Sequence, residues 1–334
     1  MKSIDEVRAL VNSELGEDKY VIIYNGKVIS NDYNDSEVRV SLSAEMDLLY
    51  EKKISEYEKL NDDNSPFSIS IYVLKSMMIK IINLGDKEKY VHKIISTKTK
   101  VKSQICDIYL SFQAKTNIKN DLIVEDRSEI DYLTFTQKND DDLTTILNTY
   151  SYGDSSINVK SLYMPKNVFR HFNTVVLLEE NSKVDMFNVI INNSNLVQNY
   201  DYDVIHKNAN NTSKLRNYAI AKGDSIINLN HNGKILKDAK KSNLNQKSRG
   251  LLLGKKSEIS ANPKLEIDEN DVVASHGASI GALNDDDIFY LMSRGLTKKE
   301  SEELLINSYI EPFLKVVCND SVRDYFKQRI KEYL

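Results

Sequence analysis

The sequence predicts a mainly β protein, a β-helix (solenoid) with helical regions at both ends. From about Phe67 to Leu283, short runs of Val, Ile, Tyr and Thr such as KYVHKIIS and NTVVLLEE are separated by Asn, Asp, Ser and Lys. The near absence of a helical period argues against βαβ units and favours a sandwich, a barrel or a solenoid. A sandwich needs many hairpin turns, but this tract has no Asp-Gly and one Asn-Gly, at Asn232-Gly233. Asn is abundant between the runs and tolerates the left-handed corners of a solenoid.

Residues 1–66 are predicted to be a helical region. Apolar residues recur at helical spacing in two places, first at Ile4, Val7, Leu10 and Val11 and then at Met46, Leu49, Ile54 and Tyr57. The segment from Asn61 to Pro66 breaks this pattern. We therefore expect three regions: an N-terminal helical region (1–66), a β-helix core (67–283) and a C-terminal helical region (284–334).

Helix signals return after Leu283. Asn284 is placed to cap a helix whose first turn is acidic, and Gly295 is placed to end it. Thr297 and Glu300 have the spacing of a capping box for a second helix. We expect Pro312 to break or kink that helix.

The overall composition excludes several classes of protein. The chain has 334 residues with 45 Lys and Arg against 49 Asp and Glu, so it has no basic field for nucleic acid or an anionic membrane. Cys106 and Cys318 are too few for a disulfide framework or a closed zinc site. The first residues contain no apolar signal segment, and the apolar stretch from Ser68 to Leu84 contains two lysines. We expect a cytoplasmic protein without a membrane span.

Two segments imitate enzyme motifs. GLLLGKKS (Gly250 to Ser257) has too few residues between its glycines for a phosphate loop, and Lys256 replaces the hydroxyl that would bind magnesium. GASIG (Gly277 to Gly281) resembles a nucleophile elbow, but His276 is the last histidine, so no base follows it. We predict that the chain is not an enzyme.

The segment from Asn262 to Leu314 contains a P-x-LEI strand, the motif SHGAS and the motif IFYL-x-SRG with a following helix. With these landmarks it resembles the C-terminal signature of the SufB/SufD family, the scaffold subunits of an iron-sulfur cluster assembly system. A looser match covers Lys160 to Val317. SHGAS is closest to the SufD branch, although Ala274 stands where that branch commonly has a cysteine. The SufB branch has a cysteine and a glutamate where this chain has Ser257 and Gly277.

The resemblance implies a right-handed parallel β-helix that is a noncatalytic scaffold with two protein partners. A SufC-like ATPase would bind the C-terminal helices, through Ile288, Phe289, Tyr290, Arg294, Leu304, Leu305 and Tyr309. A SufB-like scaffold would pair with the last strands, through Leu265, Ile267, Val273, Ser275, His276 and Ser279. ATP-driven dimerisation of the ATPase would then remodel the scaffold interface. The same helices offer a structural alternative, in which their apolar residues merely cover the open end of the solenoid.

The resemblance also implies a site at the scaffold interface. His276 would be one ligand of iron or of a transient iron-sulfur cluster whose thiolates come from the partner, with His206 and Glu266 as possible supporting residues. We expect no tightly bound cofactor, and we expect Cys106 to be a buried apolar residue.

Two other functions stay open. In a minimal system, one scaffold would form a homodimer with the ATPase. In a different class, β-solenoids act as carbohydrate-active enzymes that use clustered carboxylates. Carboxylates such as Glu266 are present, but the absence of a signal segment makes this a distant alternative.

Overall fold

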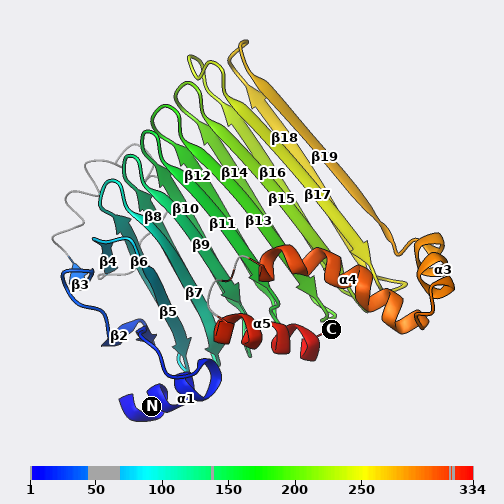
Figure 1. Cartoon of the computed structure of the whole chain (residues 1–334), viewed down its shortest axis with the longest axis horizontal. Coiled ribbons are helices and arrows are strands. Elements are labelled where there is room, and N and C mark those ends of the chain that lie inside the picture. The colour runs from blue at the N-terminus through cyan, green and yellow to red at the C-terminus, as the bar shows by residue number, and fades with distance from the viewer. Residues whose placement is uncertain (1, 44–67, 137–138, 316, 318–319, 334) are drawn as a thin grey trace.

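Two β-sheets form the body of the molecule (Figure 1). The computed structural model describes residues 2–43, 68–136, 139–315, 317 and 320–333. The ten-stranded sheet contains β1 (Val21–Tyr24), β2 (Lys27–Asn31), β5 (Met78–Gly85), β7 (Lys102–Phe112), β9 (Glu129–Thr136), β11 (Ser156–Tyr163), β13 (Lys183–Asn192), β15 (Thr212–Ala221), β17 (Asn243–Leu252) and β19 (Val273–Ala282). The nine-stranded sheet contains β3 (Val38–Ser43), β4 (Ser68–Val73), β6 (Lys89–Thr97), β8 (Thr116–Val124), β10 (Leu143–Ser151), β12 (Phe169–Leu177), β14 (Val197–His206), β16 (Ile226–Ile235) and β18 (Glu258–Ile267).

The pairs β1–β2 and β3–β4 are antiparallel neighbours within one sheet. From β4 onward, successive strands alternate between the two sheets, and each later strand pairs in parallel. Each coil therefore contributes one strand to each sheet, and the predicted parallel β-solenoid is confirmed. The coil length is regular in the middle of the chain, where the stacked partners Lys102, Glu129, Ser156 and Lys183 follow one another every 27 residues.

The corners between strands also stack. One residue with positive φ occurs at the same corner of six consecutive coils, at Lys100, Arg127, Asp154, Asn181, Asn210 and Lys241. The backbone N–H of each bonds to a carbonyl of the next coil, as in Asp154 to Glu180 at 3.1 Å. Asn was expected at such corners, but only Asn181 and Asn210 are asparagines, so the stacked backbone holds this conformation with other residues as well.

The N-terminal region is not wholly helical as predicted. It contains α1 (Ile4–Leu15), and then β1, β2 and β3 extend the two sheets. Asn25 and Gly26 both have positive φ and form the tight turn between β1 and β2, an Asn-Gly hairpin signal that the helical prediction overlooked. The second predicted helical stretch, Met46 to Tyr57, lies outside the described residues. The division into three regions remains a prediction.

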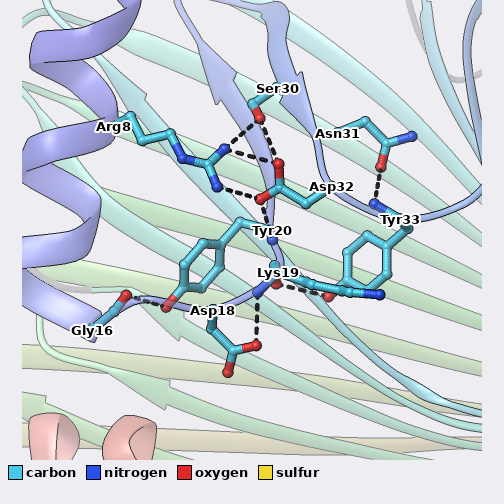
Figure 2. Close-up of polar contacts among 9 residues, drawn as sticks. All are labelled: Arg8, Gly16, Asp18, Lys19, Tyr20, Ser30, Asn31, Asp32 and Tyr33. Atoms are coloured by element: carbon cyan, nitrogen blue, oxygen red, sulfur yellow. Dashed lines mark hydrogen bonds and ion pairs between the residues drawn. The ribbon is translucent and has the colours of Figure 1, made fainter.

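Polar contacts fasten α1 to this hairpin (Figure 2). The Arg8 guanidinium donates to both carboxylate oxygens of Asp32, at 2.9 and 2.6 Å, and to Ser30 at 2.6 Å. The hydroxyl of Tyr20 donates to the Gly16 carbonyl at the end of α1, at 2.8 Å. A bidentate arginine fixes both position and angle, so α1 is held in one orientation on the sheet.

Two large apolar cores result from this arrangement, beside a small cluster of Ile94, Ile123, Tyr150 and Val176 on the nine-stranded sheet. One fills the lumen between the sheets, and the other lies between the outer face of the ten-stranded sheet and the helices α1, α4 (Lys298–Leu314) and α5 (Asp320–Tyr333). In the second core, the rings of Phe135 and Phe326 stack with their centroids 4.2 Å apart. No helix in the described part of the chain is long and apolar enough to cross a bilayer.

The C-terminal helices begin as predicted. Asn284 caps α3 (Asp285–Ser293), and Thr297 forms the predicted capping box with Glu300. The expected break at Pro312 does not occur, because α4 continues through this residue to Leu314. Proline sits in the last turn, where only a short stretch of helix follows it.

Candidate functional site

The open end of the solenoid is formed by β18 and β19. These are the outermost strands of the two sheets, so each has an edge without a strand partner among the described residues. Apolar side chains are exposed there, with Val273 62%, Ile267 38% and Ile280 38% accessible. Exposed edges that also carry apolar side chains are unusual in a folded chain and indicate a surface for pairing.

His276 lies in the middle of β19 and is exposed. Ala274 packs against the lumen core, and side chains alternate along a strand, so His276 lies on the lumen face of β19. Ser275 and Ser279 lie on the outer face, where Ser275 accepts a hydrogen bond from Asn245 at 2.6 Å. The register partner of His276 on β17 is Gln246, which is buried directly behind it.

Glu266 faces away from His276. Leu265 packs against the lumen core, so the adjacent Glu266 lies on the outer face of β18. Its carboxylate is 2.5 Å from the ammonium of Lys264 and 3.6 Å from that of Lys234, and Lys264 lowers its pKa. The carboxylate of Glu266, the predicted supporting residue, therefore forms ion pairs with lysines and does not lie near His276.

His206 is also separate from His276. It ends β14, which does not pair with β19, and it is fully buried with Nε2 2.7 Å from the hydroxyl of Ser213. Burial lowers its pKa to about 4, so the ring is neutral at pH 7. The predicted supporting residues therefore do not form a common site in the structure.

The donor set at the open end fits only part of an iron-sulfur site. Over the described ranges, no three His, Cys, Asp or Glu side chains group together for a metal. Cys106 is buried in the core beneath the helices, and Cys318 lies outside the described residues. Iron-sulfur clusters are held chiefly by thiolates, so the imidazole of His276 is not by itself a sufficient donor set for one.

Four of the residues predicted for ATPase docking are exposed. Phe289 and Tyr290 of α3 are 73% and 56% accessible, Leu304 of α4 is 50% accessible, and Arg294 lies over the Tyr290 ring at 5.1 Å. Leu305 is half-buried. These side chains do not cover the open end of the solenoid, which argues against the structural alternative.

Two of the predicted docking residues instead anchor the helices. Ile288 is 7% accessible, and the Tyr309 ring meets Tyr218 of β15 edge-on at 5.3 Å. Figure 1 shows α4 crossing the strands from the end of β19 towards β11. One face of α4 therefore packs on the sheet, and the opposite face is exposed.

A groove beside α4 was not anticipated from the sequence. It has a volume of about 910 Å³ and lies between α4, α5 and the ends of β17 and β19. It is lined by apolar side chains that include Leu252, Leu283 and Ile306 and by charged side chains that include Lys255 and Lys331. These residues lie far apart in the sequence, so no local sequence pattern predicts the groove.

Comparison with known proteins gives a consistent result. Residues 81–309 match the family model described as SUF system FeS cluster assembly, SufBD core domain. The iron-sulfur cluster assembly protein SufD of Bacillus subtilis (strain 168) is 32% identical over 151 residues, which cover 45% of this chain and 35% of that protein.

Two further relatives match shorter stretches. SufD of Escherichia coli (strain K12) is 32% identical over 87 residues, or 26% of this chain and 21% of that protein. The chloroplastic protein ABCI7 of Arabidopsis thaliana is 31% identical over 103 residues, or 31% of this chain and 22% of that protein. The chain thus spans about a third or less of the length of these relatives.

Proposed function

Because the chain belongs to the SufBD family of the SUF iron-sulfur cluster assembly system, we propose that it is a SufD-like, noncatalytic scaffold subunit. In this proposal it pairs with a SufB-like scaffold through β18 and β19 and binds a SufC-like ATPase through α3 and α4. Dimerisation of the ATPase on binding ATP then remodels the scaffold interface.

The open end of the solenoid is the observation that carries this proposal. Within the part of the chain that the structure describes, the outer edges of β18 and β19 have no strand partner, and Val273 and Ile267 add apolar surface beside them. A partner strand laid along such an edge satisfies the backbone groups and covers the apolar side chains in one step.

In this proposal, His276 is the ligand that this chain contributes to a cluster at the interface. It is exposed in the middle of β19, where a paired scaffold would meet it. The iron-sulfur cluster is cargo rather than a resident cofactor, so one imidazole here and thiolates from the partner hold it only while the two chains are paired.

The helices provide the mechanical connection. The exposed stripe of Phe289 and Leu304 receives the ATPase, while Ile310 and Phe313 of α4 are buried against the ten-stranded sheet. Because α4 is anchored on β11 and β13, a displacement of the ATPase is passed to the sheet whose last strand carries His276.

Co-expression with a SufB-like scaffold and a SufC-like ATPase tests the proposal. We expect one stable complex containing one copy of this chain, and we expect Val273→Lys to prevent scaffold pairing, measured as the mass of the eluting complex by light scattering. Val197→Lys is the matched control, because Val197 is 39% exposed at the start of β14, away from the open end.

The mass of the complex also distinguishes pairing with a second scaffold from the homodimeric alternative. Two copies of this chain with the ATPase and no second scaffold would favour the minimal homodimeric system. A chain that stays monomeric with every partner, or pairing unaffected by Val273→Lys, would contradict the proposed role of the edge.

A further inference from the structure

Basic side chains gather on the outer face of the ten-stranded sheet, beside the helices. The helices pack on the carboxyl-terminal halves of the strands, where Leu162, Ile191 and Ile220 belong to the second core (Figure 1). Side chains alternate along a strand, so the outward positions of the amino-terminal halves can be read from this register. From β11 to β17, the charged side chains at these outward positions are the carboxylate of Asp185 and the cations of Lys160, Lys183, Lys214, Arg216, Lys247 and Arg249, which we call the basic patch.

The charge of the basic patch is opposite to that of the whole chain, which has a formal net charge of -4 at pH 7. Asp185 neutralises Arg216, whose guanidinium lies 2.6 Å from its carboxylate. The other cations of the patch form no ion pair with any residue that the structure describes. Neighbouring strands lie about 4.8 Å apart, so these charges repel one another, and an anionic partner would relieve the repulsion.

The two arginines of the patch lie over aromatic rings. The guanidinium of Arg216 is 5.2 Å from the ring centre of Phe187, and that of Arg249 is 5.9 Å from the ring centre of Tyr218. In both cases the ring belongs to the register partner on the preceding strand of the sheet. A ring beneath a guanidinium limits its movement without using its N–H donors, and a carboxylate accepts two parallel hydrogen bonds from such a group. Arg249 is exposed and is therefore oriented for a carboxylate from another molecule.

The spacing of the cations matches that of an extended peptide. Alternate residues of a strand lie about 6.8 Å apart on the same face. The cations at such positions are Lys214 with Arg216 on β15, and Lys247 with Arg249 on β17. Acidic residues at alternate positions of an extended segment recur at the same distance. Access from the edge of the sheet is open, because Gly277 of β19 is the register partner of Lys247 and a Cβ added there would meet no other atom.

We propose that the basic patch binds an acidic segment of a partner protein in extended conformation, with Lys247 and Arg249 as principal contacts to its carboxylates. A nucleic acid fits the patch less well. Phe187 is 5% accessible and Tyr218 lies beneath Arg249, so bases have no open ring on which to stack. The inference concerns a surface that the proposed function does not use, and it does not depend on that function.

Fluorescence anisotropy of a labelled peptide of alternating Glu and Thr tests the inference on the purified full chain. The titration is done at low ionic strength, because salt screens exposed charges. We expect binding that weakens as salt is added, and no binding of the peptide in which Gln replaces each Glu. Lys247→Ser combined with Arg249→Ser should weaken binding of the acidic peptide at least about fivefold.

Arg39→Ser combined with Arg170→Ser is the matched control. It removes the same number of positive charges from exposed positions on β3 and β12 of the nine-stranded sheet. This variant should bind the peptide as the native chain does, and circular dichroism should show that both variants are folded. Absence of binding by the native chain, or equal weakening in the two variants, would overturn the proposal. So would tighter binding of a single-stranded oligonucleotide of the same charge, which would identify the patch as a nucleic-acid surface.

Discussion

Three histidines of the lumen are kept neutral by burial. Burial lowers the pKa of His171 to about 3 and the pKa values of His206 and His231 to about 4. In the unfolded chain the same rings titrate near their ordinary value of about 6.5. Below that value the unfolded chain binds more protons than the folded chain, so the stability is fully present above pH 6.5 and is lost progressively down to about pH 4 for His206 and His231 and about pH 3 for His171.

The first prediction concerns this pH range. At pH 5 a histidine with a folded pKa of about 4 lowers the free energy of unfolding by about 2 kcal/mol relative to pH 8. We expect His231→Gln to reduce the loss of stability between pH 8 and pH 5 by about that amount, measured by urea unfolding at both values. An unchanged difference between the two pH values would show that His231 titrates normally in the folded chain.

The second prediction concerns the buried ion pair of Lys93 and Asp107. Both side chains are fully buried, with Nζ of Lys93 2.6 and 2.7 Å from the carboxylate oxygens, and Tyr132 donates to the same carboxylate at 2.6 Å. Burial lowers the pKa of Lys93, while Asp107 opposes this shift.

Removing one charge from this pair leaves the other unpaired in the lumen. We expect Lys93→Met to lower the free energy of unfolding by about 3 to 5 kcal/mol. Adding Asp107→Asn should recover a large part of the loss, because the uncompensated charge disappears. Urea unfolding of both variants checks this, and an equal loss in the double variant would indicate that packing rather than charge is decisive.

Each of the helices α3 and α4 has one face of buried side chains that holds it in place and an opposite face of side chains that are exposed. We predict that Phe289→Ala with Leu304→Ala weakens ATPase binding at least about tenfold, since large apolar side chains carry most of the energy of such contacts. Titration calorimetry with the ATPase measures this effect. Phe172→Ala is the control, because Phe172 is 40% exposed on β12; equal weakening by the control would exclude a specific surface on α3 and α4.

For the molecule as a whole, stability should decrease towards the open end. Each coil of a solenoid contacts only its neighbours, and the last coil has one neighbour instead of two. We predict that amides of β18 and β19 exchange with deuterium fastest among the strands, and that β7 to β11 exchange slowest. Hydrogen exchange with mass spectrometry measures both, and pairing with a second scaffold should slow β19; uniform exchange along the solenoid would contradict this.

Local patterns were sufficient for much of the fold. The strand tract, the caps at Asn284 and Thr297 and the helices after them follow from neighbouring residues, and the structure confirms them. The strands β1 to β3 were missed because they are short and the helical pattern of Val7 and Val11 was extended across them, although Asn25-Gly26 marked a hairpin.

The sequence by itself determined the β-solenoid class, the family and the position of His276 on a strand near the end of the tract, because these depend on residues close together in the chain. Only the tertiary structure decided which residues meet. The length of each coil decides which side chains stack, and near the open end it places Gln246 directly behind His276. The alternation of side chains along β18 turns Glu266 to the outer face, where Lys264 contacts it.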